Sequence, residues 1–401
     1  MQLALLFMVV AAVVAIVAQR LRLPYTVALV IAGLAAGALH LLPPVAVSSE
    51  VLLTIVIPPL LFEGALRLSP THLRAYGLLI GLLAIPGTLL AAVGIGWAAA
   101  AAGVPPQAAM LLGVIAAAID PVSVIALVRE AGLDPRLAAI LEGEAVLNDG
   151  VVIVLFTIVS GPALGGVWSA AGQFVWLIAA GGLVGVLLAA GVSYVLGRVA
   201  QPLVETLGSL ILLVGSQLAA GRLGASGIIA VMCAGVVFAS SGRRSLASGG
   251  QETLRTVWDF LAFLANSALF LFIGLQVTGA HLVRHGVLIA AVVAAALAVR
   301  AITVYGFAAV SRRFGVGMLP AWRHVLFWGG LRGGVAIALA LGLAAGLPGR
   351  DDVAAAVFGL VVFTLIGQGL SMPALMRRVG LLPATAVSLT TRTRTVAVVV
   401  Q

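Results

Sequence analysis

The chain consists mostly of apolar runs about 20 residues long, which short polar segments separate. A helix needs about 20 mainly apolar residues to cross the hydrocarbon core of a bilayer. The pattern therefore predicts an all-α polytopic membrane protein with about thirteen transmembrane helices. The predicted spans are 2–19, 25–42, 50–66, 76–101, 106–128, 138–160, 172–196, 203–220, 224–241, 256–276, 286–310, 322–347 and 353–376.

Composition supports this prediction and excludes several classes of binding partner. Hydrophobic residues make up 62% of the chain and charged residues only 9%, which excludes an ordinary soluble protein. The net charge of +9 comes without basic clusters interleaved with aromatic residues, so we expect no nucleic acid partner. The loops are too short for a soluble regulatory domain, and no P-loop or Rossmann motif is present, so we expect no nucleotide and no cofactor.

Arginine placement predicts the orientation in the membrane. All 22 basic residues are arginines, and 17 of them fall in the C-terminal tail or in, or within two residues of, the loops after odd-numbered spans. The positive-inside rule places that side in the cytoplasm. We therefore expect a multi-pass protein of the cell (plasma or inner) membrane, with its N-terminus outside and its C-terminus cytoplasmic.

Two of the predicted spans contain helix-breaking residues. In span five, Pro121 has no N–H and frees the carbonyl of Ala117 one turn earlier. In span twelve, four glycines surround Arg332 within residues 329–334. The two spans are seven apart and so run in opposite directions. This predicts a single transporter domain over 1–401 with inverted halves at about 1–160 and 203–380, in which two interrupted helices cross.

Charged side chains inside these apolar spans are the candidate site. Ionisable residues at membrane depth are costly and usually functional. We expect Asp149, beside Asn148, to bind the cation and the proton. Asp120 is either a second ligand or a charge that neutralises the helix N-termini at the break. Glu63 is either an entry ligand or a side chain that reaches the membrane interface.

Glu144 and Arg332 are predicted to form a structural ion pair, because loss of either member would leave an unpaired buried charge. Arg300 also lies inside a span, and the sequence gives no partner for it.

Five short motifs together resemble the NhaP/NHE (sodium/proton exchanger) branch of the monovalent cation/proton antiporters. They are FEGAL at 62–66, AIDP at 118–121, GEAVLNDG at 143–150, NSALF at 266–270 and WGGLRGG at 328–334. The resemblance covers about residues 50 to 375. It implies a homodimer in which one domain moves against another. It also implies a Na⁺ site at Asp149 with Asp120 nearby, Glu63 at the cytoplasmic approach, and Glu144 with Arg332 as the structural pair.

Two positions depart from the pattern of this family. Ala145 stands where a serine is common, and Ile119 where a threonine is common. Ser123, one turn away, is a candidate substitute ligand. The departures leave potassium as an alternative transported ion.

The sequence therefore predicts a secondary antiporter and not an enzyme. It would exchange a monovalent cation, sodium first, for a proton by alternating access. Since Asn148 does not titrate and the chain has no lysine, we expect electroneutral exchange. Three alternatives were weighed, namely a potassium/proton antiporter, a cation channel and an intramembrane hydrolase using Asp120 and Asp149. A channel needs a continuous polar pore and a hydrolase a polar substrate cleft, and neither is apparent.

Overall fold

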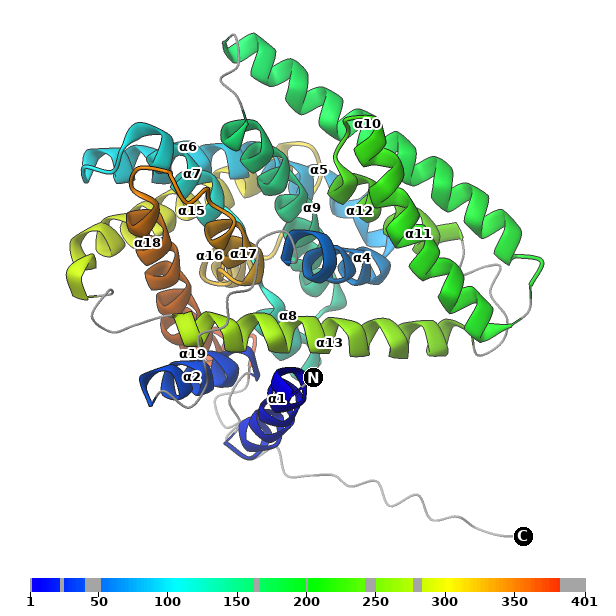
Figure 1. Cartoon of the computed structure of the whole chain (residues 1–401), viewed down its shortest axis with the longest axis horizontal. Helices are drawn as coiled ribbons and strands as arrows, with labels where there is room; N and C mark the ends of the chain where they lie inside the picture. Colours follow the sequence, from blue (N-terminus) through cyan, green and yellow to red (C-terminus); the bar gives the residue numbers. More distant parts are fainter. Residues whose placement is uncertain are drawn as a thin grey trace.

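The structure is a computed structural model that describes residues 2–21, 25–39, 52–161, 166–199, 201–241, 250–276 and 283–382. Every regular element in these ranges is a helix (Figure 1), which confirms the predicted all-α class. Seven of the helices are long and apolar enough to cross a membrane. The count of thirteen crossings stays a prediction, since several other elements are short or broken.

The elements follow the predicted spans closely. The N-terminal part contains α1 (Gln2–Leu21), α2 (Tyr25–Ala38), the π-helix η1 (Leu52–Val56), α4 (Ile57–Arg67), α5 (Pro70–Ala84), α6 (Pro86–Ala101), α7 (Pro106–Ala116), α8 (Val122–Glu130) and α9 (Pro135–Ser160). The middle contains α10 (Val167–Leu196), α11 (Pro202–Arg222), α12 (Gly227–Ser241) and α13 (Gly250–Gln276). The last part contains α15 (Gly286–Arg313), α16 (Pro320–Trp328), α17 (Gly334–Leu341), α18 (Arg350–Val362), the π-helix η3 (Phe363–Gly369) and α19 (Leu370–Arg378).

Both predicted interruptions are present. The helical pattern stops between α7 and α8 at residues 117–121, and again between α16 and α17 at 329–333. A further interruption was not predicted. Pro86 divides the fourth span into α5 and α6, with Ile85 at the junction. This junction brings the first turn of α6 close to the break between α7 and α8.

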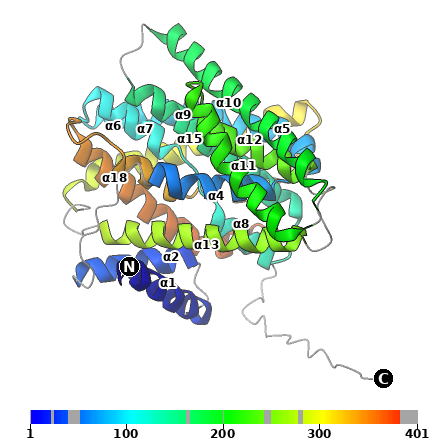
Figure 2. The same cartoon turned by 45° about the vertical axis from the view of Figure 1, so that its right-hand side comes forward.

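The helices form two groups that meet along α4, α9, α12 and α13. In one group α10 packs on α11 and α12, and α13 packs on α2 and α4. In the other, α6 packs on α7 and α15, α5 packs on α9, and α18 packs on α7 and α15. Figures 1 and 2 show α13 running between α1 and α2 on one side and α4 on the other, and α10 and α11 pack against each other. The two breaks lie in the second group.

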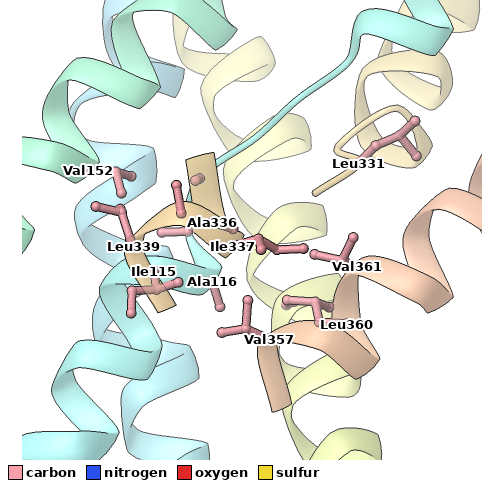
Figure 3. Close-up of a cluster of buried hydrophobic side chains, with 14 of the residues drawn as sticks. Ile115, Ala116, Val152, Leu331, Ala336, Ile337, Leu339, Val357, Leu360 and Val361 are labelled. Carbon is pink, nitrogen blue, oxygen red and sulfur yellow. The ribbon is translucent and has the colours of Figure 1, made fainter. Parts of the chain in front are cut away.

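Apolar side chains fill the space around the breaks. Figure 3 shows Ile115 and Ala116 of α7, Ile337 of α17 and Val357 of α18 gathered in one cluster, and all four are buried. Lipid is as apolar as these side chains, so close van der Waals packing has to hold membrane helices together. The cluster therefore packs the half-helices against each other beside the breaks.

Candidate functional site

The two interrupted segments are in direct backbone contact. The N–H of Asp120 donates to the carbonyl of Leu331 at 2.8 Å. Gly333 lies against the side chain of Asp120, where any Cβ would overlap Oδ2. Glycine is therefore required at this position for the two breaks to approach.

The end of α7 is closed by polar side chains from elsewhere in the chain. The carbonyl of Ala117, which Pro121 was predicted to free, accepts from Nδ2 of Asn148 at 3.1 Å and from Nη1 of Arg332 at 3.3 Å. Nη1 of Arg332 also donates to the carbonyl of Ala118 at 3.0 Å. A cation at a helix C-terminus is favoured by the helix dipole. Arg332 thus stabilises the negative end of α7.

Asp120 faces the opposite ends of two half-helices. Its carboxylate accepts from the N–H of Val122 at 3.3 Å, at the start of α8, and from the N–H of Gly334, at the start of α17. Helix N-termini carry partial positive charge and unsatisfied N–H groups. Of the two roles that the sequence left open for Asp120, these contacts favour neutralisation of the helix N-termini.

Asn148 holds the first break from the side of α9. Its Oδ1 accepts from the N–H of Ile119 at 2.8 Å, and its Nδ2 donates to Oγ1 of Thr88 at 2.6 Å as well as to Ala117. Thr88 in turn donates to the carbonyl of Ala84 at 2.6 Å. Both ends of the buried amide are therefore engaged by protein atoms. This makes Asn148 a brace for the break, and a direct role in ion binding finds no support in these contacts.

Asp149 is the carboxylate left without such contacts. Its Oδ1 is buried and has no hydrogen-bond partner among the described residues. Asp120 lies close enough for the two carboxylates to repel each other electrostatically. A buried anion without a partner is costly, and a proton or a bound cation relieves both the burial and the repulsion. Asp149 and Asp120 therefore form the chemical centre of the candidate site.

The predicted ion pair between Glu144 and Arg332 is wrong. Glu144 instead accepts two hydrogen bonds from Arg300 of α15, through Nη1 to Oε1 and through Nη2 to Oε2 at 2.9 Å. Arg300 reaches it past Gly330, where a Cβ would lie 2.9 Å from Nε. Arg332 was the predicted partner, yet its Nη1 donates to the carbonyls that end α7.

The other two predicted residues lie in separate contacts. Glu63 forms an ion pair with Arg67 one turn along α4, and Arg67 donates to Asp259 of α13 at 2.9 Å. The hydroxyl of Ser123 is hydrogen-bonded to Thr26 of α2 at 2.6 Å. Neither residue has a described hydrogen bond or ion pair with Asp149 or Asp120, so their predicted roles as ligands remain predictions.

Three supporting contacts were not found from the sequence. Thr88 braces Asn148, Arg300 pairs with Glu144, and Oγ1 of Thr364 accepts from the N–H of Arg332 at 3.1 Å. A threonine directly after Pro86 and Gly87 was the available signal for Thr88, because an interrupted span needs polar partners for its backbone. Arg300 stood out as a charge inside a span, but nothing in the sequence indicated its partner, and Thr364 lies in an ordinary apolar run.

Comparison with known proteins identifies the family of this chain. Residues 7–378 match the family described as "Sodium/hydrogen exchanger, transmembrane". The Na(+)/H(+) antiporter ApNhaP of Aphanothece halophytica is 39% identical over 373 residues, which cover 90% of this chain and 70% of that protein. The Na(+)/H(+) antiporter NhaP of Pseudomonas aeruginosa is 35% identical over 348 residues, covering 82% and 81%.

A solved structure shares the fold. The sodium proton antiporter MjNhaP1 from Methanocaldococcus jannaschii superposes with a TM-score of 0.78 at 22% identity, covering 94% of this chain and 98% of that one. Fold and family together define a multi-pass membrane transporter and not an enzyme. The chain belongs to the sodium/hydrogen exchanger family.

We predict strong coupling between Glu144 and Arg300. Removing either partner leaves a buried unpaired charge, which costs about 3–5 kcal/mol. The double variant Glu144→Ala/Arg300→Ala should therefore be less destabilised than the sum of the single variants. Thermal unfolding of the detergent-solubilised variants measures this. The matched cycle of Glu144→Ala with Arg332→Ala should show weaker coupling, and the reverse ranking would contradict the assigned pair.

We also predict that Thr88→Val destabilises the protein while Thr88→Ser does not. Valine keeps the shape of threonine but leaves one buried N–H of Asn148 without its acceptor, at a cost of about 1–3 kcal/mol. Serine keeps the hydroxyl. Unfolding midpoints in detergent compare the three proteins. Equal midpoints for Thr88→Val and the unaltered protein would show that this hydrogen bond does not brace Asn148.

Proposed function

We propose that this protein is a secondary antiporter that exchanges sodium for protons across the membrane. The observation that carries the proposal is Asp149, a carboxylate in a membrane helix whose Oδ1 is buried without a hydrogen-bond partner among the described residues. It stands beside a second carboxylate where two broken helices meet. Membership of the sodium/hydrogen exchanger family supports the same function.

In this mechanism a cation and a proton compete for one carboxylate. Asp149 gives up its proton when Na⁺ binds, and takes a proton when Na⁺ leaves. Asp120 adds negative charge beside the ion while its oxygens hold the N-termini of α8 and α17. Asn148 and Thr88 position the first break and do not touch the ion. With either a proton or Na⁺ bound, the negative charge of Asp149 is compensated. The loaded carboxylate can therefore move between the two sides of the membrane.

The names of the relatives support sodium as the transported cation. The proteins from Aphanothece halophytica and Pseudomonas aeruginosa are both named Na(+)/H(+) antiporters, and this counts against the potassium alternative. We propose that carbonyls and water complete the coordination that Ala145 and Ile119 cannot provide through a hydroxyl. Ser123 and Glu63 are proposed to contact the ion on its way to Asp149 and not at Asp149 itself.

The remaining features are proposed on the same basis. The chain acts as one transmembrane unit with inverted halves at about 1–160 and 203–380, and as a homodimer in the cell membrane. Its N-terminus is outside and its C-terminus cytoplasmic, as the arginine bias indicates. It uses no cofactor besides the transported ions. Alternating access moves the loaded carboxylate between the two sides, which sets this protein apart from a channel.

We predict that Asp149→Asn abolishes exchange and leaves the protein folded, because the amide neither releases a proton nor balances a cation. The variant is reconstituted in vesicles that contain a pH-sensitive dye, and sodium, potassium or lithium is added in turn. Asp351→Asn, at an exposed position of α18, is the matched control and should exchange normally. Normal cation-dependent proton flux in folded Asp149→Asn would refute the proposed site.

We further predict electroneutral 1:1 exchange. One carboxylate trades one proton for one monovalent cation, Asn148 does not titrate, and the chain has no lysine to release a second proton. A membrane potential, worth about 2.3 kcal/mol per charge per 100 mV, then has no effect on the exchange equilibrium. The measurement is the final proton gradient in proteoliposomes at a fixed sodium gradient, with and without a clamped potential. A shift with potential alone would show that a second group, Asp120 first, carries charge.

A further inference from the structure

A small polar pocket lies beside the second break, between α15, α18 and η3. Its polar lining consists of Arg300, Arg332, Thr364 and Gln368, and its remaining walls are almost all apolar. The space open to the centre of a water-sized sphere is about 10 Å³. A water molecule needs about 10–15 Å³ by this measure. The pocket therefore has room for one small ligand.

Two buried polar atoms of the lining have no partner among the described residues. They are Nε of Arg332, a donor, and Oε1 of Gln368, an acceptor. The two side chains are only 3% and 1% exposed. A buried polar atom without a hydrogen bond costs about 1–3 kcal/mol, so both atoms call for a partner inside the pocket.

The other two polar side chains of the lining are already engaged. Nη1 and Nη2 of Arg300 hold Glu144, and Nη2 also donates to the carbonyl of Leu326 at 2.8 Å. Oγ1 of Thr364 accepts from the N–H of Arg332 and donates to the carbonyl of Val361 at 3.1 Å. Among the fully buried side-chain atoms of the lining, one donor and one acceptor are therefore left without a hydrogen bond to the described residues.

Only a ligand that both accepts and donates satisfies this pair. A water molecule accepts from Nε and donates to Oε1. A halide accepts from Nε but meets the lone pairs of Oε1. We propose that one water molecule binds in this pocket and bridges Arg332 to Gln368, and that Gln368 is thereby a positioning residue for Arg332.

The bridge would complete a clamp on the arginine that closes α7. Thr364 holds the backbone of Arg332, and Gln368, four residues later on the same π-helix, holds its guanidinium through the water. π-helical segments are rare and often occur at functional sites. Since Nη1 of Arg332 binds the carbonyls of Ala117 and Ala118, the clamp sets the position of the first break beside the cation site. This role of Gln368 rests on the proposed function, whereas the water site does not.

Transport by three variants tests the positioning role. Gln368→Met removes the acceptor at similar length, Gln368→Glu keeps one, and Leu365→Met is a matched control on the same π-helix outside the pocket. Outer partners of metal ligands change affinity by about 10–100-fold. Gln368 acts one step further out, so we expect Gln368→Met to raise the half-saturating sodium concentration about three- to tenfold at a little-changed maximal rate. Gln368→Glu and Leu365→Met should stay within about twofold of the unaltered protein.

If Gln368 were purely structural, Gln368→Met would have a lower unfolding midpoint but would not raise the half-saturating sodium concentration while keeping the maximal rate. That result, or unchanged half-saturation, would overturn the positioning role. A Gln368→Glu variant as impaired as Gln368→Met would overturn it too, because an acceptor would then not suffice.

Occupancy is tested by high-resolution crystallography of the full chain grown with sodium bromide. We expect one density peak within hydrogen-bonding distance of Nε of Arg332 and Oε1 of Gln368, without anomalous signal and absent from Gln368→Met. An anomalous bromide peak would identify an anion site instead and overturn the water. A direct hydrogen bond between the two side chains, with no peak, would also overturn it. Lack of sodium/proton exchange in the unaltered protein would refute the proposed function but leave this test of the water intact.

Discussion

The structure depends on one constraint: the bilayer core holds no water, so every backbone polar group there needs a hydrogen-bond partner within the protein. Two broken helices at membrane depth expose carbonyls at one end of each break and N–H groups at the other. Here Arg332 and Asn148 bind the carbonyls of Ala117 and Ala118, while Asp120 binds N–H groups at the starts of α8 and α17. Charges that would otherwise be too costly in lipid are therefore retained because they complete the backbone.

Once those contacts are made, the two aspartates are no longer equivalent. Asp120 is committed to helix ends, whereas Oδ1 of Asp149 has no hydrogen-bond partner among the described residues. A group that is already satisfied gains little from binding a cation, whereas an unsatisfied carboxylate gains much. The polar residues that satisfy the broken backbone thus leave one acid, Asp149, available for the proposed ion.

The sequence predicted the fold and pointed to a candidate site centre at Asp149, since both predictions rest on local signals. Hydropathy marks the spans, Pro121 marks the first break, and the glycines around Arg332 mark the second. The freed carbonyl of Ala117 was predicted from the geometry of proline alone, and it has the expected polar partners. The partner of Glu144 could not be found in this way. Arg300 lies 156 residues away in an alanine- and valine-rich helix, and only the packing of α15 on the second break brings it within reach.

The same reasoning explains why two guanidiniums are needed where the sequence suggested one. Arg300 is neutralised by Glu144, so this pair adds no net charge near the ion. Arg332 has no described carboxylate within ion-pair distance and interacts instead with the carbonyls that end α7. If Arg332 paired with Glu144, those carbonyls would lose their cationic donor, and the first break would lose one of its contacts with the second. One arginine cannot bind a carboxylate and a helix end with the same N–H donors. With two arginines, Arg300 binds Glu144 while Arg332 binds the carbonyls at the end of α7.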